Sequence, residues 1–253
     1  MNTIDIITRK GEPFGKLTAY PITLRDYEVF QENKVCLTLM QKRIGIEFAQ
    51  MPYLHMITIL TTEQFNLLGM LGKVLSLVFR IDEEQIRINI AKDTGKVTLL
   101  IISQGGNPEL IESISELRFN KLRALIAEQN NIKLPDERAN LEILESEESI
   151  ANMNSLNLEV NFKSLFFSVA TYCGLSTEQM LDMTIYEFEE RVSAISRISR
   201  YFIYNIGEMS GMVNFKNGNP CPSWCFDKKE DGLHGTIPLA QFQKQVGDVI
   251  KPV

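Results

Sequence analysis

The stretch "FNLLGMLGKVLSLVF" at residues 65–79 constrains the fold more than any other part of the chain. Just before it, Thr61 and Gln64 have the spacing of a capping box in front of an apolar run. The run is apolar on most faces of a helix, so we expect a helix that is covered on more than one side. It is too short to span a bilayer and carries Lys73 at its middle, so we expect no membrane association. The rest of the chain must therefore supply a core around this helix.

The composition is that of an ordinary globular protein. The chain has 253 residues, of which 44% are hydrophobic and 23% are charged, which suits one large domain or two smaller ones. A net charge of −6 argues against a nucleic-acid partner, because such proteins need a basic face. The four cysteines are too few for a disulfide scaffold, and the first residues do not resemble an export signal. We therefore expect intracellular synthesis with reduced thiols.

The N-terminal part is expected to combine helices with one β-hairpin. Thr23 can cap a helix whose buried face includes Leu24, Tyr27 and Phe30. The stretch "IRINIAKDTGKVTLLII" at residues 86–102 alternates apolar and polar residues, turns at "KDTGK", and resumes with apolar and β-branched residues. This pattern predicts a hairpin in which Gly95 supplies the positive φ.

The C-terminal part is expected to be helical. The segment "SELRFNKLRALIAEQNN" predicts a helix with Leu117, Leu122, Leu125 and Ile126 on one stripe, and an acidic connection follows it. Further on, Gly174 is a candidate helix C-cap. Capping boxes at Ser176 with Gln179 and Thr184 with Glu187 then predict a long helix, a short one and a longer one. In the last helix the apolar spacing runs through Ile185, Phe188, Val192, Ile195 and Ile198.

Together these patterns predict a mainly helical α+β protein, with a small β-hairpin in its N-terminal part and a C-terminal helix array closed by a strap. The predicted parts are an N-terminal helical part with the hairpin (1–134), an acidic connection (135–154), and the helix array with its strap (155–253). Near the C-terminus, "TIPLAQFQKQVGDVI" predicts one turn and one amphipathic helix.

The stretch "NPCPSWCFDKKEDGLHG" at residues 219–235 is the one place that suggests metal or redox chemistry. Cys221 and Cys225 have a spacing that zinc accepts, and His234 could be a third ligand, but no fourth ligand lies nearby. A redox pair prefers two intervening residues at a helix start. We favour a third interpretation, in which the cysteines and Trp224 are apolar contacts of a strap packed on the helix array. No cofactor is expected.

Enzyme motifs are otherwise missing, so we expect no catalytic residue. The chain has two histidines and no nucleophile elbow, phosphate-binding loop, dinucleotide fingerprint or zinc-protease motif. His55 lies among apolar neighbours in the sequence. This is more typical of a helix or core histidine whose hydrogen bonds are satisfied than of a catalytic base. Two interpretations are open for Arg191, Arg197 and Arg200. They either form a basic stripe for a carboxylate-bearing partner or, as we favour, pair with glutamates of their own helix.

The methionines favour protein binding. Methionine suits adaptable surfaces that accept a partner helix, although core filling explains any single one of them more simply. Eight of the ten methionines lie in or beside expected helices: Met40, Met51, Met56, Met70, Met180, Met183, Met209 and Met212.

One segment resembles a known family. "GKLTAYPITLRDYEVFQENKVC" resembles the opening of the bacteriophage baseplate-protein family related to the small hub-assembly protein of T4-type contractile tails. The segments "LRALIAEQNNIKLPDE" and "SWCFDKKEDGLHGTIPLAQF" look like related proteins of phages and phage-tail-like bacteriocins. T4-type members carry a cysteine pair in the middle of the chain, where this chain has its hairpin without cysteine. The resemblance therefore does not imply a metal-binding turn in this chain. The residues that match in kind at the start of the first helix are Tyr20, Pro21, Thr23, Asp26, Tyr27 and Phe30.

The resemblance implies a non-enzymatic protein-binding factor in the assembly of a contractile tail, acting as a tail or baseplate assembly chaperone. Its partners would be other tail or baseplate proteins, including the tape-measure protein, in the host bacterial cytoplasm or in the virion tail. Two alternatives are a permanent structural subunit of the baseplate and a metal-binding or redox enzyme that uses Cys221 and Cys225. The oligomeric state is open. The expected partner contacts are Tyr27, Phe30, Met180, Tyr186 and Tyr201.

Overall fold

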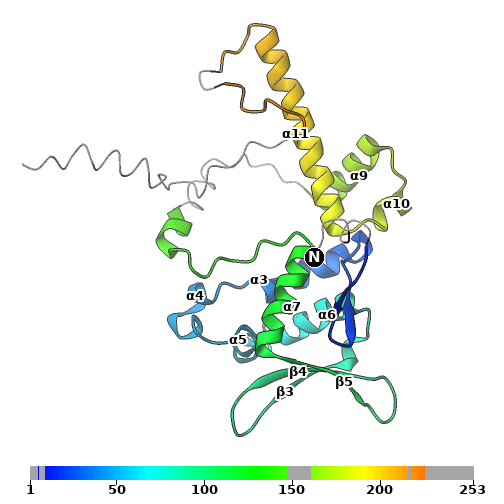
Figure 1. The fold of residues 1–253 in the computed structure, drawn as a ribbon, viewed down its shortest axis with the longest axis vertical. Helices are drawn as coiled ribbons and strands as arrows, with labels where there is room; N and C mark the ends of the chain where they lie inside the picture. The colour runs from blue at the N-terminus through cyan, green and yellow to red at the C-terminus, as the bar shows by residue number, and fades with distance from the viewer. Residues whose placement is uncertain (1–4, 6–8, 147–160, 216–217, 226–253) are drawn as a thin grey trace, which may run out of the picture. The chain divides into compact units, whose positions relative to one another are not determined.

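The computed structural model describes residues 5, 9–146, 161–215 and 218–225. Within them the chain has the mainly helical α+β architecture that the sequence predicted (Figure 1). It divides into two compact units, Met1–Arg191 and Val192–Val253, whereas the sequence predicted a division at residues 135–154. Residues 147–160 of that connection lie outside the described residues. None of the described helices has the length and apolarity that crossing a membrane requires.

The described part of the first unit contains two small antiparallel sheets. The predicted hairpin is confirmed, and Gly95 has the expected positive φ of 66°. A third strand extends this hairpin into a sheet of order β3-β4-β5, although the sequence did not predict it. The strands are β1 (Glu12–Phe14), β2 (Leu17–Ala19), β3 (Ile86–Ile90), β4 (Val97–Ile102) and β5 (Leu110–Ser115).

Helices make up most of the remainder, and α11 (Ile185–Met209) continues from the first unit into the second. Short 3-10 turns lie at η1 (Leu24–Asp26), η2 (Ile46–Phe48) and η3 (Glu83–Gln85). The other helices are α2 (Tyr27–Asn33), α3 (Val35–Thr38), α4 (Gln41–Ile44), α5 (Tyr53–Leu60), α6 (Leu67–Phe79), α7 (Glu116–Gln129), α9 (Phe162–Cys173) and α10 (Thr177–Leu181).

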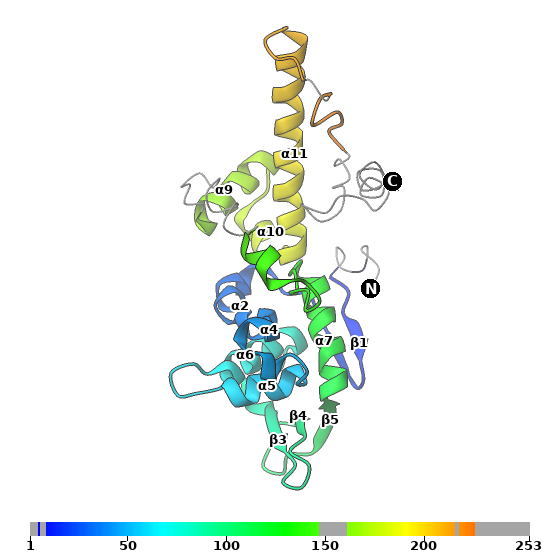
Figure 2. The same ribbon diagram turned by 90° about the vertical axis from the view of Figure 1, so that its left-hand side faces the viewer.

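Helix α6 is the covered helix that the sequence predicted. It packs against α2, α3, α5, β2 and β3, so neighbours surround it (Figure 2). Its start differs from the prediction, because Asn66 caps it by accepting a hydrogen bond from the Gly69 N–H at 2.8 Å. The Thr61 hydroxyl instead donates to the Ile57 carbonyl at the end of α5, at 2.8 Å. The buried side chains of α6 are Leu67, Leu71, Val74, Leu75, Val78 and Phe79.

The expected helix after Thr23 is broken into η1, α2 and α3. Thr23 makes no side-chain cap, because its backbone pairs with Thr184 in an isolated β-bridge. That extended pairing postpones the α-helix to Tyr27. A contact distant in sequence therefore overrides the local N-cap signal.

Helix α7 begins after Ser115, as predicted, but its buried face differs from the predicted stripe. Leu117 is 77% exposed, and Arg123 takes a buried position instead. The Arg123 Nε donates to the Leu37 carbonyl at 2.6 Å, and its guanidinium lies 3.6 Å from the centre of the Tyr53 ring. Burial lowers the pKa of Arg123, while burial raises the pKa of the neighbouring Cys36 thiol to about 12.

The three C-terminal helices follow the predicted order. Gly174 ends α9 in the left-handed conformation, with φ 65°. The Ser176 and Gln179 capping box is confirmed, since each side chain accepts a hydrogen bond from the other residue's backbone N–H. At the start of α11 the Thr184 hydroxyl accepts a hydrogen bond from the Glu187 N–H at 3.1 Å. These local signals were sufficient to place the helix boundaries.

Candidate protein-binding surface

The segment that carries the family resemblance joins the N-terminal helices to the C-terminal ones inside the first unit. The Leu24 N–H donates to the Met183 carbonyl at 2.9 Å, and the Ile185 N–H donates to the Ile22 carbonyl at 3.0 Å. Arg25 reaches Glu178 at 2.7 Å. These bonds make residues 22–25 a structural junction within the chain.

Three of the five expected contact residues lie at or next to this junction. Tyr27 stacks on Phe162 of α9, with ring centroids 4.0 Å apart and planes 13° apart, and burial raises its pKa. Phe30 and Met180 are both 0% exposed. A partner could reach Phe30 or Met180 only if the core opened, so neither side chain belongs to a binding surface in this structure.

The other two expected contacts are half-buried tyrosines of α11. Tyr186 lies in the first unit, where burial followed by the charges of Glu190 and Glu128 raises its pKa. Tyr201 lies in the second unit, and its ring centroid is 5.6 Å from that of Phe202. The structure therefore does not bring the five residues together into one surface.

The distal part of α11 carries an exposed apolar face. Beyond Phe188 the helix has no buried residue, yet apolar side chains recur at intervals of three and four residues. Phe202 is 57% exposed, Ile206 is 65% exposed and Met209 is 88% exposed. Large apolar residues that gather on one face at this spacing are typical of a surface that receives another helix. We call this face the α11 stripe: Val192, Ile195, Ser199, Phe202, Ile203, Ile206 and Met209.

The stripe continues a spacing that begins in the core. Ile185 and Phe188 occupy the two preceding positions of the same repeat and are 0% and 1% exposed. The sequence prediction followed this spacing only to Ile198. The same spacing continues through Phe202, Ile206 and Met209, so the sequence does contain the pattern that marks the exposed face.

The strap lies on the other side of α11. Its described residues are 218–225, drawn in orange beside α11 in Figure 2. The Arg197 Nε donates to the Trp224 carbonyl at 3.2 Å, and the Asn219 side chain donates to Glu208 at 3.0 Å.

Helix geometry shows that the strap leaves the stripe uncovered. Each residue turns an α-helix by about 100°. Arg197 is five residues before Phe202, and Glu208 is two residues after Ile206. Both strap contacts therefore lie well away from the stripe around the helix axis. The described strap residues hold the polar side of α11 and leave its apolar side open.

The cysteines of the strap are free thiols. The Cys221 Sγ is 3.8 Å from the Arg197 carbonyl oxygen, and the Cys225 Sγ is 3.5 Å from the Ser223 hydroxyl. Among the described residues, no group of three or more histidine, cysteine, aspartate or glutamate side chains could hold a metal ion. His234, the third candidate ligand, lies outside the described residues. In the described part of the strap the expected apolar packing is not seen, because Trp224 is 57% exposed and Cys225 is exposed, while Cys221 is half-buried.

The other candidate side chains have structural partners. Arg191 pairs with Glu187 at 2.9 Å, which is the ion pair that we favoured from the sequence. His55 is half-buried, with its Nδ1 3.8 Å from a carboxylate oxygen of Glu116. Of the eight methionines singled out in the sequence, four are core residues: Met40, Met56, Met180 and Met183. Met209 and Met212 are the strongly exposed ones among the eight, at 88% and 85%.

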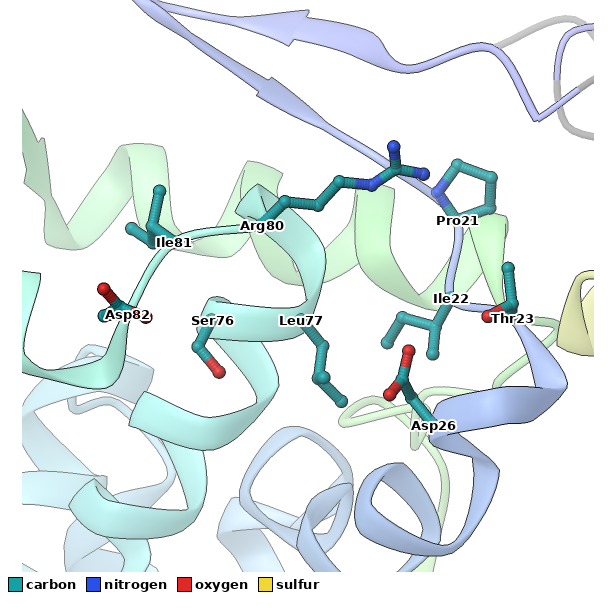
Figure 3. Close-up of a pocket in the computed structure, with 9 residues that line it drawn as sticks. All are labelled: Pro21, Ile22, Thr23, Asp26, Ser76, Leu77, Arg80, Ile81 and Asp82. Atoms are coloured by element: carbon teal, nitrogen blue, oxygen red, sulfur yellow. The ribbon is translucent and has the colours of Figure 1, made fainter.

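A polar cavity of about 430 Å³ lies between the junction segment and the end of α6 (Figure 3). Arg80, which has a left-handed backbone with φ 56°, stacks over the Tyr20 ring at 4.0 Å. Asp26 and Asp82 reach the cavity from separate elements. Because the one guanidinium is engaged by Tyr20, the cavity is a weaker candidate site than the α11 stripe.

Comparison with known proteins gives no independent identification. No family model matches the chain, and no curated protein or solved structure matches it.

Proposed function

We propose that this chain is a non-enzymatic protein-binding factor that acts in the assembly of the contractile tail of a phage or phage-tail-like particle. The exposed α11 stripe carries the proposal. It presents Phe202, Ile203, Ile206 and Met209 on one helical face, with Phe202, the least exposed of them, at 57%. The resemblance of residues 20–30 to the baseplate family supports the tail as the setting, and the host cytoplasm as the place of action.

The chemistry of the stripe suits a helix of a tail protein as the partner. The stripe contains no charged residue, so its free energy of binding would come from apolar burial. The α-helical face from Ile195 to Met209 is about 21 Å long, which matches a partner helix of about four turns. A partner helix bound along the stripe would contact apolar side chains three and four residues apart, as in helix-in-groove recognition.

The stripe can be tested with a charge-matched pair of variants. Phe202→Asp with Ile206→Asp places two charges where apolar side chains should be buried, so co-purification of tail proteins identified by mass spectrometry should fall at least tenfold. Ser193→Asp with Arg200→Asn changes the net charge equally at exposed positions off the stripe and should leave that yield unchanged. Equal yields from both variants would exclude the stripe as the binding surface.

Mass spectrometry of purified tail particles, compared with the lysate that produced them, decides between chaperone and subunit. An assembly chaperone would be present in the lysate and absent from the finished particle. Stoichiometric presence in the particle would instead make the chain a permanent baseplate subunit. Failure to co-purify with any tail protein would contradict both roles.

A further inference from the structure

The described chain ends beside α11. The strap begins level with Glu208, to which Asn219 is bonded, and returns to Arg197, to which the Trp224 carbonyl is bonded. It therefore runs antiparallel to α11, and the described residues end at Cys225, next to the Trp224 that is bonded to Arg197. The 28 residues that follow Cys225 lie outside the described residues.

The sequence of that last segment has a matching apolar pattern. Leu239, Phe242, Val246 and Val249 recur at intervals of three and four residues. The residues between them are mainly polar, as in "QKQ" and Asp248. On an α-helix these four apolar residues would share one face. The stripe follows the same intervals through Ile195, Ser199, Phe202, Ile206 and Met209, with Ser199 as its one polar position.

The length of residues 239–250 matches that of the stripe, and the residues before them are long enough to reach it. As an α-helix, residues 239–250 would be about 18 Å long, against about 21 Å for the stripe from Ile195 to Met209. The preceding residues, 226–238, can extend over about 40 Å. The path half-way round a helix about 10 Å in diameter is only about 16 Å. The chain is therefore long enough to pass from the strap side of α11 to its apolar side.

We propose that residues 239–250 of the same chain occupy the α11 stripe and are displaced when a tail protein binds. This regulation rests on the proposed function of the stripe as the partner-binding surface. Tethering favours the chain's own segment over a second copy, because a segment joined to the strap by so few residues has an effective concentration in the millimolar range. A second copy of the chain at micromolar concentration would compete poorly for the same face.

Cross-linking in the full-length chain tests this contact directly. Cys173, Cys221 and Cys225 are replaced by serine, which leaves only the buried Cys36. Phe202→Cys is then combined with Val246→Cys and treated with a short bismaleimide. The matched control combines Arg200→Cys, which is exposed on the same helix but off the stripe, with Val246→Cys.

The expected result is an intramolecular product of monomer mass, several-fold more abundant from the Phe202 pair than from the Arg200 pair. Equal yields would overturn the proposal, and so would products of dimer mass, which would show a second copy on the stripe. Circular dichroism of each variant shows that it is folded. If Phe202→Cys disturbs the helix, Ile206→Cys with Val246→Cys supplies the same comparison.

The cross-linking experiment and the test of the proposed function can each fail without the other. A monomeric cross-link without capture of any tail protein would retain the covering contact and refute the assembly role. Capture of tail proteins without the cross-link would retain the assembly role and refute the cover. Phe242→Asp with Val246→Asp should also increase tail-protein capture several-fold, because it would free the stripe.

Discussion

Helices α6 and α11 are both rich in large apolar residues, but they meet different surroundings. α6 buries Leu67, Leu71, Leu75 and Val78 among others, because helices and strands pack around it. α11 buries Ile185 and Phe188 in the first unit and no described residue beyond them. The comparison shows that an apolar helix face can be buried in a core or can stay exposed and available to another segment. The tertiary structure decides which of the two occurs.

The sharpest test of this comparison replaces a buried phenylalanine of α2, which packs against α6, and an exposed phenylalanine of the α11 stripe. Phe30→Ala should lower the free energy of unfolding by about 3–5 kcal/mol, since Phe30 is fully buried and leaves a cavity. Phe202→Ala should lower it by only about 1 kcal/mol, because Phe202 is 57% exposed among the described residues and a segment that a partner can displace is bound weakly. Chemical denaturation of both variants provides the measurement. Similar losses would mean that the α11 stripe is as tightly packed as the core.

A smaller effect is expected at Glu112, which ties the β1–β2 hairpin to β5 and α7. Its carboxylate accepts hydrogen bonds from Arg118 at 2.8 Å and from the Lys16 N–H at 2.7 Å, and the bond from Arg118 is the main reason why its pKa is lowered. Glu112→Gln should therefore lower the free energy of unfolding by about 1–2 kcal/mol at neutral pH.

The pH dependence of this loss has a definite sign. A carboxyl whose folded-state pKa is lowered stabilises the fold above its unfolded pKa of about 4.3, and this stabilisation is lost as pH falls through the folded value. The difference between Glu112→Gln and the unmutated chain should therefore shrink at acidic pH. Urea denaturation from pH 7 to pH 3 measures it, with the exposed Glu109→Gln as control. A difference that stays constant with pH would contradict the assignment.

The smallest effect is expected at the exposed ion pairs of the junction. Arg25 contacts Glu178 at 2.7 Å and Asp182 at 2.8 Å, but its side chain is 48% exposed. Arg25→Ala should cost less than about 1 kcal/mol at low salt and less still at high salt, because exposed pairs are screened. Thermal denaturation at two salt concentrations tests this. A large loss that does not respond to salt would show that Arg25 is part of the packed core.

Several features were predictable because neighbouring residues decide them. The β3–β4 hairpin follows from alternating side chains and from Gly95, whose φ of 66° few other residues adopt easily. The start of α10 follows from Ser176 and Gln179, which satisfy each other's backbone within one turn. The apolar spacing of α11 likewise predicted a long amphipathic helix.

Other features depend on residues far apart in the chain. β5 has weak strand signals of its own and exists as a strand because β4 offers it a hydrogen-bonding edge. The N-cap expected at Thr23 is replaced by a bridge to Thr184. Phe30 and Met180 were expected to contact a partner, yet other parts of the same chain cover them completely.

The sequence by itself determined the β3–β4 hairpin and the starts of α7, α10 and α11, since capping, turn geometry and periodicity act over a few residues. It also determined that Phe202, Ile206 and Met209 share a helical face with Ile185 and Phe188. Only the tertiary structure decided that the first three stay exposed while the last two are buried. The physical reason is that burial depends on which distant segment packs against a helix face. The local sequence around an apolar residue does not specify that segment.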